Sequence, residues 1–238
     1  MPSPLTVVMI EADILFRGMM VAILCLFAAV FAATYFHDRK QQFAAWLAIA
    51  YTCGLAAFLV DISRAAFDPI VSDVTAKLLF WGFSLAFCAG IFSRHDTKFP
   101  TVIVGTIVGI GLAIISWFSL IEPDTALRTI FSSSIAGLIL VVALPVSWKN
   151  RKGILENIFF LLFTLLCATY FVRPLLVYGI LDIANTAGGY RNSTYDALLY
   201  GSSAICALTC GMNLLIIIGS DIIRAHQLAS TRDPLTGL

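Results

Sequence analysis

Charged residues are scarce in this chain, and long polar stretches are missing from it. Only 12% of its 238 residues are Asp, Glu, Lys or Arg, whereas 60% are hydrophobic, and the mean hydropathy is +0.93. Soluble globular domains carry about 25% charged residues. The composition therefore excludes a soluble domain and indicates an integral membrane protein. The net charge of +1 provides no basic field, so we expect no nucleic-acid partner.

Several other features are absent. The six cysteines lie inside apolar runs and not in loops, which excludes a secreted disulfide framework and predicts small core residues. The N-terminus lacks a positive region before an apolar run, so we expect no cleaved signal peptide. No internal repeat favours an inverted-repeat transporter. No glycine-rich phosphate loop or cluster of metal-binding acids follows the apolar part, so we expect no catalytic residue, cofactor or metal in this chain.

What the chain does contain is seven apolar segments, each long enough to cross about 30 Å of hydrocarbon. A helix rises about 1.5 Å per residue, so about 20 residues suffice. We therefore predict an all-α membrane protein, a seven-transmembrane-helix bundle. The predicted spans are residues 14–36, 43–62, 73–93, 99–121, 127–148, 154–181 and 195–221.

The loops between these spans alternate in charge. The stretches "HDRKQQ", "SRHDTK" and "KNRKG" are basic, whereas "SRAAFDPIVSD" and "EPD" are acidic or balanced. Because basic loops stay on the cytoplasmic side, we predict the N-terminus outside and the C-terminus cytoplasmic. Beyond the last span, apolar residues continue at helical spacing, so we expect this helix to extend into the cytoplasm.

Ionisable residues within the spans gather in the half predicted to face outward. Such residues are costly at membrane depth and mark functional sites by default. They are candidates for binding a small anionic or amphipathic ligand, with an acid such as Asp61 or Asp182 as a resting partner. An alternative interpretation is that Arg17, Lys77 and Arg128 snorkel to the headgroups while Asp61 and Arg64 cap helix ends. The candidate ligand-binding residues are Arg173, Arg17, Asp61, Arg64, Lys77 and Arg128.

The chain closes on "RDPLTGL", which resembles the opening of the diguanylate cyclase (GGDEF) domain, Asp-x-Leu-Thr-Gly-Leu. The match covers six residues, and it follows a helical extension of a membrane bundle, where membrane-bound members of that family place their catalytic domain. The matching residues are Asp233, Leu235, Thr236, Gly237 and Leu238. From the residues alone, Asp233 also fits a helix cap, with Thr236 and Gly237 in the turn.

The resemblance implies a domain plan for the chain. Residues 1–221 form a seven-helix sensor domain, 222–232 a cytoplasmic signalling helix, and 233–238 the first residues of a truncated GGDEF domain. The family joins two GTP molecules into cyclic di-GMP with Mg²⁺, so GTP and Mg²⁺ are expected for the missing catalytic domain. This chain alone is expected to be inactive.

The same chemistry needs two facing catalytic domains, which implies a homodimer in the lipid bilayer. Apolar residues at alternating steps of three and four predict a coiled-coil seam. The seam residues are Leu215, Ile218, Ile222, Ala225 and Ala229. Two other interpretations stay open at this point: a small-molecule transporter-like bundle, and a sensor for a degenerate GGDEF or phosphodiesterase output.

Overall fold

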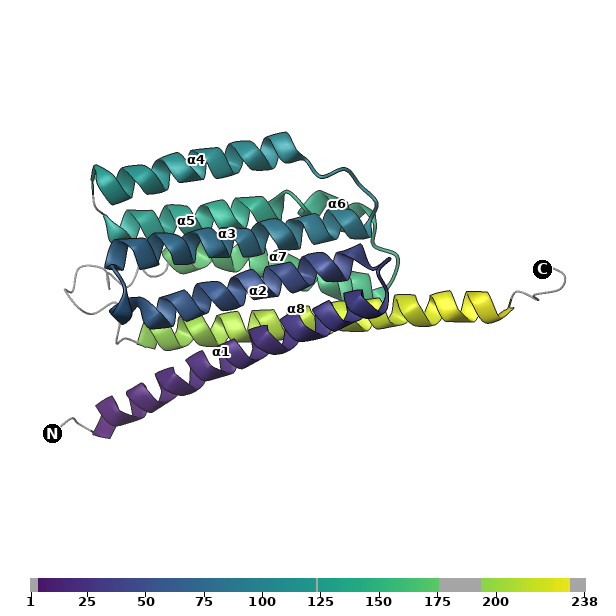
Figure 1. The fold of residues 1–238 in the computed structure, drawn as a ribbon, viewed down its shortest axis with the longest axis horizontal. Helices are drawn as coiled ribbons and strands as arrows, with labels where there is room; N and C mark the ends of the chain where they lie inside the picture. The colour runs from purple at the N-terminus through teal and green to yellow at the C-terminus, as the bar shows by residue number, and fades with distance from the viewer. Residues whose placement is uncertain (1–3, 123, 176–193, 232–238) are drawn as a thin grey trace.

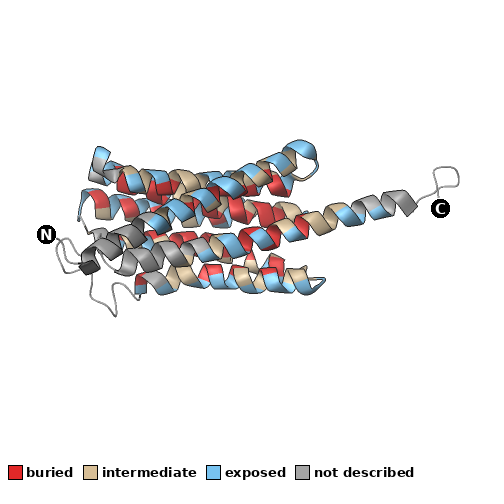
Figure 2. Cartoon of the chain, turned by 90° about the horizontal axis from the view of Figure 1, so that it is seen from below, coloured by how far each residue is buried: buried red, intermediate tan, exposed pale blue. Residues whose placement is uncertain are grey.

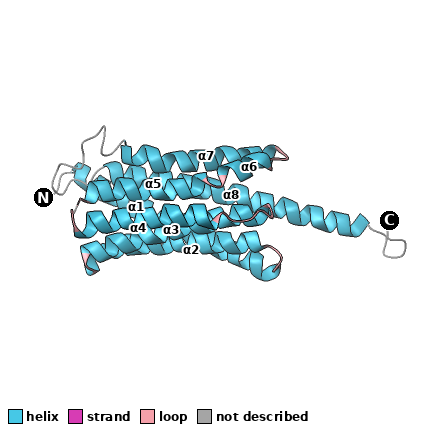
Figure 3. Cartoon of the chain, turned by 90° about the horizontal axis from the view of Figure 1, so that it is seen from above, coloured by secondary structure: helices cyan, strands magenta, loops and turns pink. Residues whose placement is uncertain are grey.

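The described part of the protein consists of helices joined by short loops (Figures 1 and 3). The computed structural model describes residues 4–122, 124–175 and 194–231. The helices are α1 (Pro4–His37), α2 (Gln42–Ile62), the 3-10 turn η1 (Ser63–Ala66), α3 (Pro69–Arg94), α4 (Thr101–Leu120), α5 (Thr125–Val141), α6 (Leu144–Lys149), α7 (Ile154–Leu175) and α8 (Thr194–Thr231).

Seven stretches of the described helices are long and apolar enough to cross a membrane, which confirms the predicted number of spans. The chain is therefore a multi-pass membrane protein with an all-α fold. The end of the predicted sixth span, residues 176–181, lies outside the described residues. The predicted fifth span is divided into α5 and α6 at residues 142–143, just before Pro145. Proline has no amide hydrogen and cannot continue a helix, but it is well tolerated in the first turn of a new one.

Six helices form a closed ring, in the order α1, α2, α3, α5, α7 and α8, with α8 packed back on α1. The remaining span, α4, packs on the outside of the ring against α5. Where α4 approaches the ring, Gly111 leaves no room for a side chain, because an added Cβ would lie 2.6 Å from Trp81 and 3.0 Å from Ile135. Apolar side chains on the outer surface suit contact with lipid, and buried residues face the ring interior (Figure 2).

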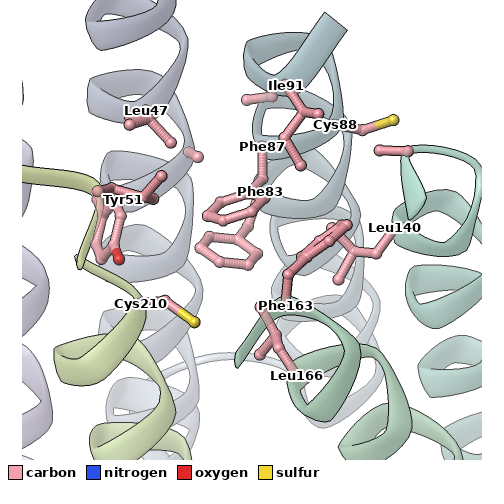
Figure 4. Close-up of a cluster of buried hydrophobic side chains, with 14 of the residues drawn as sticks. Leu47, Tyr51, Phe83, Phe87, Cys88, Ile91, Leu140, Phe163, Leu166 and Cys210 are labelled. Atoms are coloured by element: carbon pink, nitrogen blue, oxygen red, sulfur yellow. The ribbon is translucent and has the colours of Figure 1, made fainter. Parts of the chain in front are cut away.

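Aromatic rings fill the interior of the ring. Tyr51 of α2 contacts Phe83 of α3, which contacts Phe87, and Phe87 stacks on Phe163 of α7 (Figure 4). The Tyr51 hydroxyl donates a hydrogen bond of 3.1 Å to the Ala207 carbonyl of α8. Aromatic pairs add about 0.5–1.5 kcal/mol each beyond the area they bury. This interior therefore ties α8 to the rest of the bundle.

Successive spans run in alternating directions, so the loops between them fall at two ends (Figure 1). We call the end at which α8 leaves the bundle the exit end; it carries loops 38–41, 95–100 and 150–153. The opposite end, with residues 63–68, 121–122 and 124, is the far end. The three basic loops share the exit end, as predicted. Their assignment to the cytoplasm stays a prediction.

Candidate functional site

Two acidic caps define the helix starts that build the site at the far end. The Asp68 carboxylate accepts hydrogen bonds from the amides of Ile70 and Val71, at 2.9 and 3.1 Å, and begins α3. The Asp124 carboxylate accepts one from the amide of Leu127 at 2.9 Å and begins α5. Carboxylates are preferred at this position because they satisfy the free amides of the first turn. The caps therefore fix where the first turns of two neighbouring helices lie.

Three charged side chains from these turns meet in the interior. The Asp73 carboxylate forms an ion pair with Lys77 one turn further along α3. The same oxygen lies 2.8 Å from Nε of Arg128 on α5, an ion pair without hydrogen-bond alignment. Asp73, Lys77 and Arg128 are 5%, 8% and 6% exposed, and we call them the far-end cluster. One carboxylate thus bridges two cations in a buried position inside the spans.

Neighbouring groups support this arrangement. Arg128 also donates a hydrogen bond of 3.4 Å to the Ser119 hydroxyl, near the end of α4. Trp81 donates its indole hydrogen to the Ser132 carbonyl of α5 at 3.0 Å, one turn beyond Lys77. The amino end of a helix favours negative charge, so the position of Arg128 close to the start of α5 is unfavourable for a cation. The neighbouring Asp73 carboxylate offsets this unfavourable position.

The far-end cluster corrects part of the sequence interpretation. Snorkelling to the headgroups is wrong for Lys77 and Arg128, because both are buried and paired with Asp73. Asp73 was missed as the partner. Its spacing of four residues before Lys77 is the signal that identifies it, since side chains at that spacing share a helix face.

The other candidate ligand-binding residues are described less fully. Arg17 on α1 and Asp61 near the end of α2 are half-buried. The side chains of Arg64 and Arg173 lie outside the described part of the structure, and so does Asp182. Of the six predicted residues, the described contacts bring together Lys77 and Arg128.

A second group of charges lies at the exit end. Arg94, the last residue of α3, donates to the carboxylate of Asp221 on α8 at 2.8 Å and to that of Glu156 on α7 at 3.2 Å. The other oxygen of Glu156 accepts the backbone amide of Lys152. The side chains of Arg94, Glu156 and Asp221 are 16%, 24% and 43% exposed, and we call them the exit-end cluster.

His95 follows Arg94 directly at this end. It lines the same hollow as Arg94 and Glu156. Burial lowers the pKa of the His95 imidazole below its ordinary value of 6.5, and the charges of Arg94 and Lys152 lower it further, against the opposite effect of Glu156 and Asp221. His95 is therefore mainly neutral at pH 7.

The predicted seam on α8 needs a correction. Ile218 is buried in the core of its own bundle, and Leu215 and Ile222 pack against that core. Ile218 is therefore not available to a second copy, whereas Leu215 and Ile222 are only partly buried. Pairing of two copies stays a prediction. The side chains of Ala225 and Ala229, and residues 233–238 with the GGDEF-like phrase, lie outside the described residues.

Comparison of the chain with family models, with curated proteins and with solved structures finds no match.

Proposed function

We propose that this chain is the transmembrane sensory domain of a diguanylate cyclase. In this proposal an anionic or amphipathic ligand binds the far-end half of the bundle, and α8 carries the signal to a cytoplasmic domain that makes cyclic di-GMP. The cytoplasmic domain follows residue 238, binds GTP and Mg²⁺, and works as a homodimer in the inner membrane.

One observation carries the proposal: α8 is a single helix from Thr194 to Thr231. Its membrane span covers Ile205–Arg224, and the helix continues for seven more residues to within two positions of Asp233. Figure 1 shows this extension projecting past the other helices. A continuous helix passes rotation or translation of its span directly to whatever follows it. This is the geometry that a sensor needs next to the GGDEF-like phrase.

The ligand class follows from the chemistry of the far-end cluster. Lys77 and Arg128 are buried cations that share the Asp73 carboxylate. A carboxylate or phosphate group can take the place of Asp73 beside Arg128, because guanidinium groups bind both in the same geometry. A ligand that binds one arrangement better shifts the bundle toward it.

Insertions into α8 test whether this helix controls the cytoplasmic domain, because each added residue rotates that domain about the helix axis. We expect insertion of two alanines after Gln227 to rotate the following domain by about 200° and to abolish regulated cyclic di-GMP synthesis in the parent protein. Four alanines rotate it by about 400°, close to a full turn, and should restore regulation. The matched control is the same pair of insertions after Asp96, in the loop between α3 and α4. The proposal fails if both insertions after Gln227 leave synthesis and its regulation unchanged.

Two probes that share the same alkyl tail and differ in the headgroup test the ligand class. We expect decanoate to change cyclic di-GMP synthesis by the parent protein, and decanol to have no effect. Replacing Arg128 with Gln should raise the half-maximal decanoate concentration about tenfold or more. Lys98→Gln, on the exposed loop at the exit end, is the control and should leave it unchanged. Equal responses to decanoate and decanol would remove the anionic headgroup from the proposal.

A further inference from the structure

Helix α3 is the one element that belongs to both charged clusters. Asp73 and Lys77 lie in its first turns, and Arg94 is its last residue. Arg94 lies 21 positions after Asp73, which corresponds to about 32 Å at about 1.5 Å per residue. The Trp81, Phe83 and Phe87 side chains, buried between these ends, hold the middle of α3 in the aromatic core. A displacement at the start of α3 is therefore carried along a packed helix to Arg94.

Asp221 lies where α8 leaves the bundle. Ile217 and Ile218, one turn earlier, are buried, whereas Ile223 and Arg224 just beyond are exposed. The charged hydrogen bond from Arg94 to Asp221 therefore joins α3 to α8 at the base of the projecting segment. Arg94 also binds Glu156, so α7 is fixed at the same point. Its guanidinium lies 5.5 Å from the ring of Phe43 on α2, which adds a fourth helix.

The exit-end cluster borders a hollow and not a packed wall. The hollow is small, with a cavity volume of about 10 Å³, roughly the space of one water molecule. Leu214 and Ile217 of α8 line one side of it, Phe159 of α7 another, and Ser147 of α6 and Asn150 after it complete the lining. Interiors are otherwise packed closely enough to resist displacement. The hollow therefore marks the side of α8 beside Arg94 on which the packing is less close and a small shift of α8 meets less resistance.

We propose that Arg94 is the positioning residue for α8, and that α3 couples it to the far-end cluster. With Arg94 bound to Asp221 and Glu156, the base of the projecting segment is held against α3 and α7. A shift of α3 that follows an exchange of partners at Asp73 moves Arg94, releases Asp221, and lets α8 move toward the hollow. This inference rests on the proposed function for the meaning of the signal, but not for the contacts themselves.

Hydrogen exchange of the backbone amides tests the contacts without any enzyme assay. In the full chain in lipid nanodiscs, we expect Arg94→Gln to accelerate exchange of the α8 amides from Leu215 to Gln227 about tenfold, since hydrogen bonds to charged groups are lost. Arg94→Lys keeps the charge and should restore exchange in part. The matched control is Arg151→Gln, whose guanidinium stacks on Trp148 at the same end. It should leave α8 unchanged.

The coupling through α3 has its own measurement. We expect Asp73→Asn to accelerate exchange in the same α8 amides when Arg94 is present, and to add nothing in the Arg94→Gln background. If Arg94→Gln leaves α8 at the wild-type rate, or if Arg151→Gln has an equal effect, the positioning role is overturned. If the effects of Asp73→Asn and Arg94→Gln are additive, the coupling is overturned.

The same variants in the parent protein separate this inference from the proposed function. An Arg94-dependent change in α8 exchange without any cyclic di-GMP synthesis supports the positioning role and overturns the proposed output. Regulated cyclic di-GMP synthesis that is unaffected by Arg94→Gln supports the proposed function and overturns the positioning role.

Discussion

The far-end and exit-end clusters are built with opposite charge patterns. At the far end, one carboxylate, Asp73, lies between two cations, and all three residues are less than a tenth exposed. At the exit end, one guanidinium, Arg94, lies between two carboxylates whose side chains are 24% and 43% exposed. Buried ion pairs are strongly destabilised when one partner is removed, whereas partly exposed pairs are screened by water. The far-end cluster therefore has a larger effect on folding, and the exit-end cluster can open without unfolding the bundle.

The two clusters also differ in what they connect. The far-end cluster joins α3 to its ring neighbour α5. The exit-end cluster joins α3 to α8, which do not adjoin each other in the ring, through residues 127 positions apart in the sequence. A contact between helices that are not neighbours in the ring depends on the positions of the helices between them, so it changes when the bundle as a whole rearranges. This difference suits the first cluster to binding and the second to output.

Removal of the Asp73 charge should have the largest effect. We expect Asp73→Asn to lower the free energy of unfolding by about 3–5 kcal/mol, because Lys77 and Arg128 stay buried without their shared carboxylate. Chemical unfolding in mixed micelles measures this. The matched control is Asp68→Asn, five residues earlier at the same end of α3, where the amide oxygen still caps the helix and the cost should be a few tenths of a kcal/mol. Equal costs for the two variants would contradict the difference between the clusters.

An apolar replacement of the whole far-end cluster separates stability from function. We expect the triple variant Asp73→Leu, Lys77→Leu and Arg128→Met to unfold within about 1–2 kcal/mol of the wild type, because no unpaired charge is left buried. In the parent protein it should lose the response to decanoate. The control is Asp73→Leu alone, which leaves Lys77 and Arg128 buried without their shared carboxylate and should be less stable than the triple variant. A triple variant that still responds to decanoate would show that the ligand binds elsewhere.

Salt should distinguish the clusters with a smaller effect. We expect 1 M NaCl to accelerate hydrogen exchange of the α8 amides near Asp221 several-fold, since the screening length falls to about 3 Å. The amides near Lys77 should not respond, because buried pairs are screened much less. In the Arg94→Gln variant the salt effect on α8 should disappear. Salt effects of the same size at both clusters would mean that the far-end cluster is open to water.

The sequence predicted the parts of this arrangement that depend on local pattern. Hydropathy located the seven spans, and the cost of charge in a membrane identified Lys77 and Arg128. The partner was missed because the predicted third span began at residue 73, which placed Asp73 at a helix end, whereas α3 begins at Pro69. The break before Pro145 was a local signal that the hydropathy of the fifth span concealed.

The exit-end cluster could not be predicted in this way. Arg94 counted only as a basic loop residue, since the contacts of its side chain are made by helices distant in the sequence. No spacing rule links Arg94 to Asp221. The same reason explains Ile218: its position in the α8 stripe fits a seam between copies, but the packing of α8 on α1 and α7 buries it in its own bundle.

A pH change should produce the smallest effect, and only at the exit end. The pKa of His95 is lowered in the closed arrangement and should return toward 6.5 when α8 moves away and water enters. A group with a lowered pKa binds its proton more readily in the open arrangement, so the closed one loses stability as the pH falls below about 6.5, and does not change above it. Lowering the pH from 7.5 to 5.5 crosses the ordinary imidazole pKa of 6.5, which His95 approaches when α8 moves away. We expect α8 amide exchange, divided by the intrinsic rate, to rise about two- to threefold over this range, because protonation of His95 favours the open arrangement. His95→Gln should abolish the rise, while His37→Gln, at the end of α1 on the same side, should keep it. A rise that survives in His95→Gln would assign the titration to another group and leave the exit-end cluster insensitive to His95.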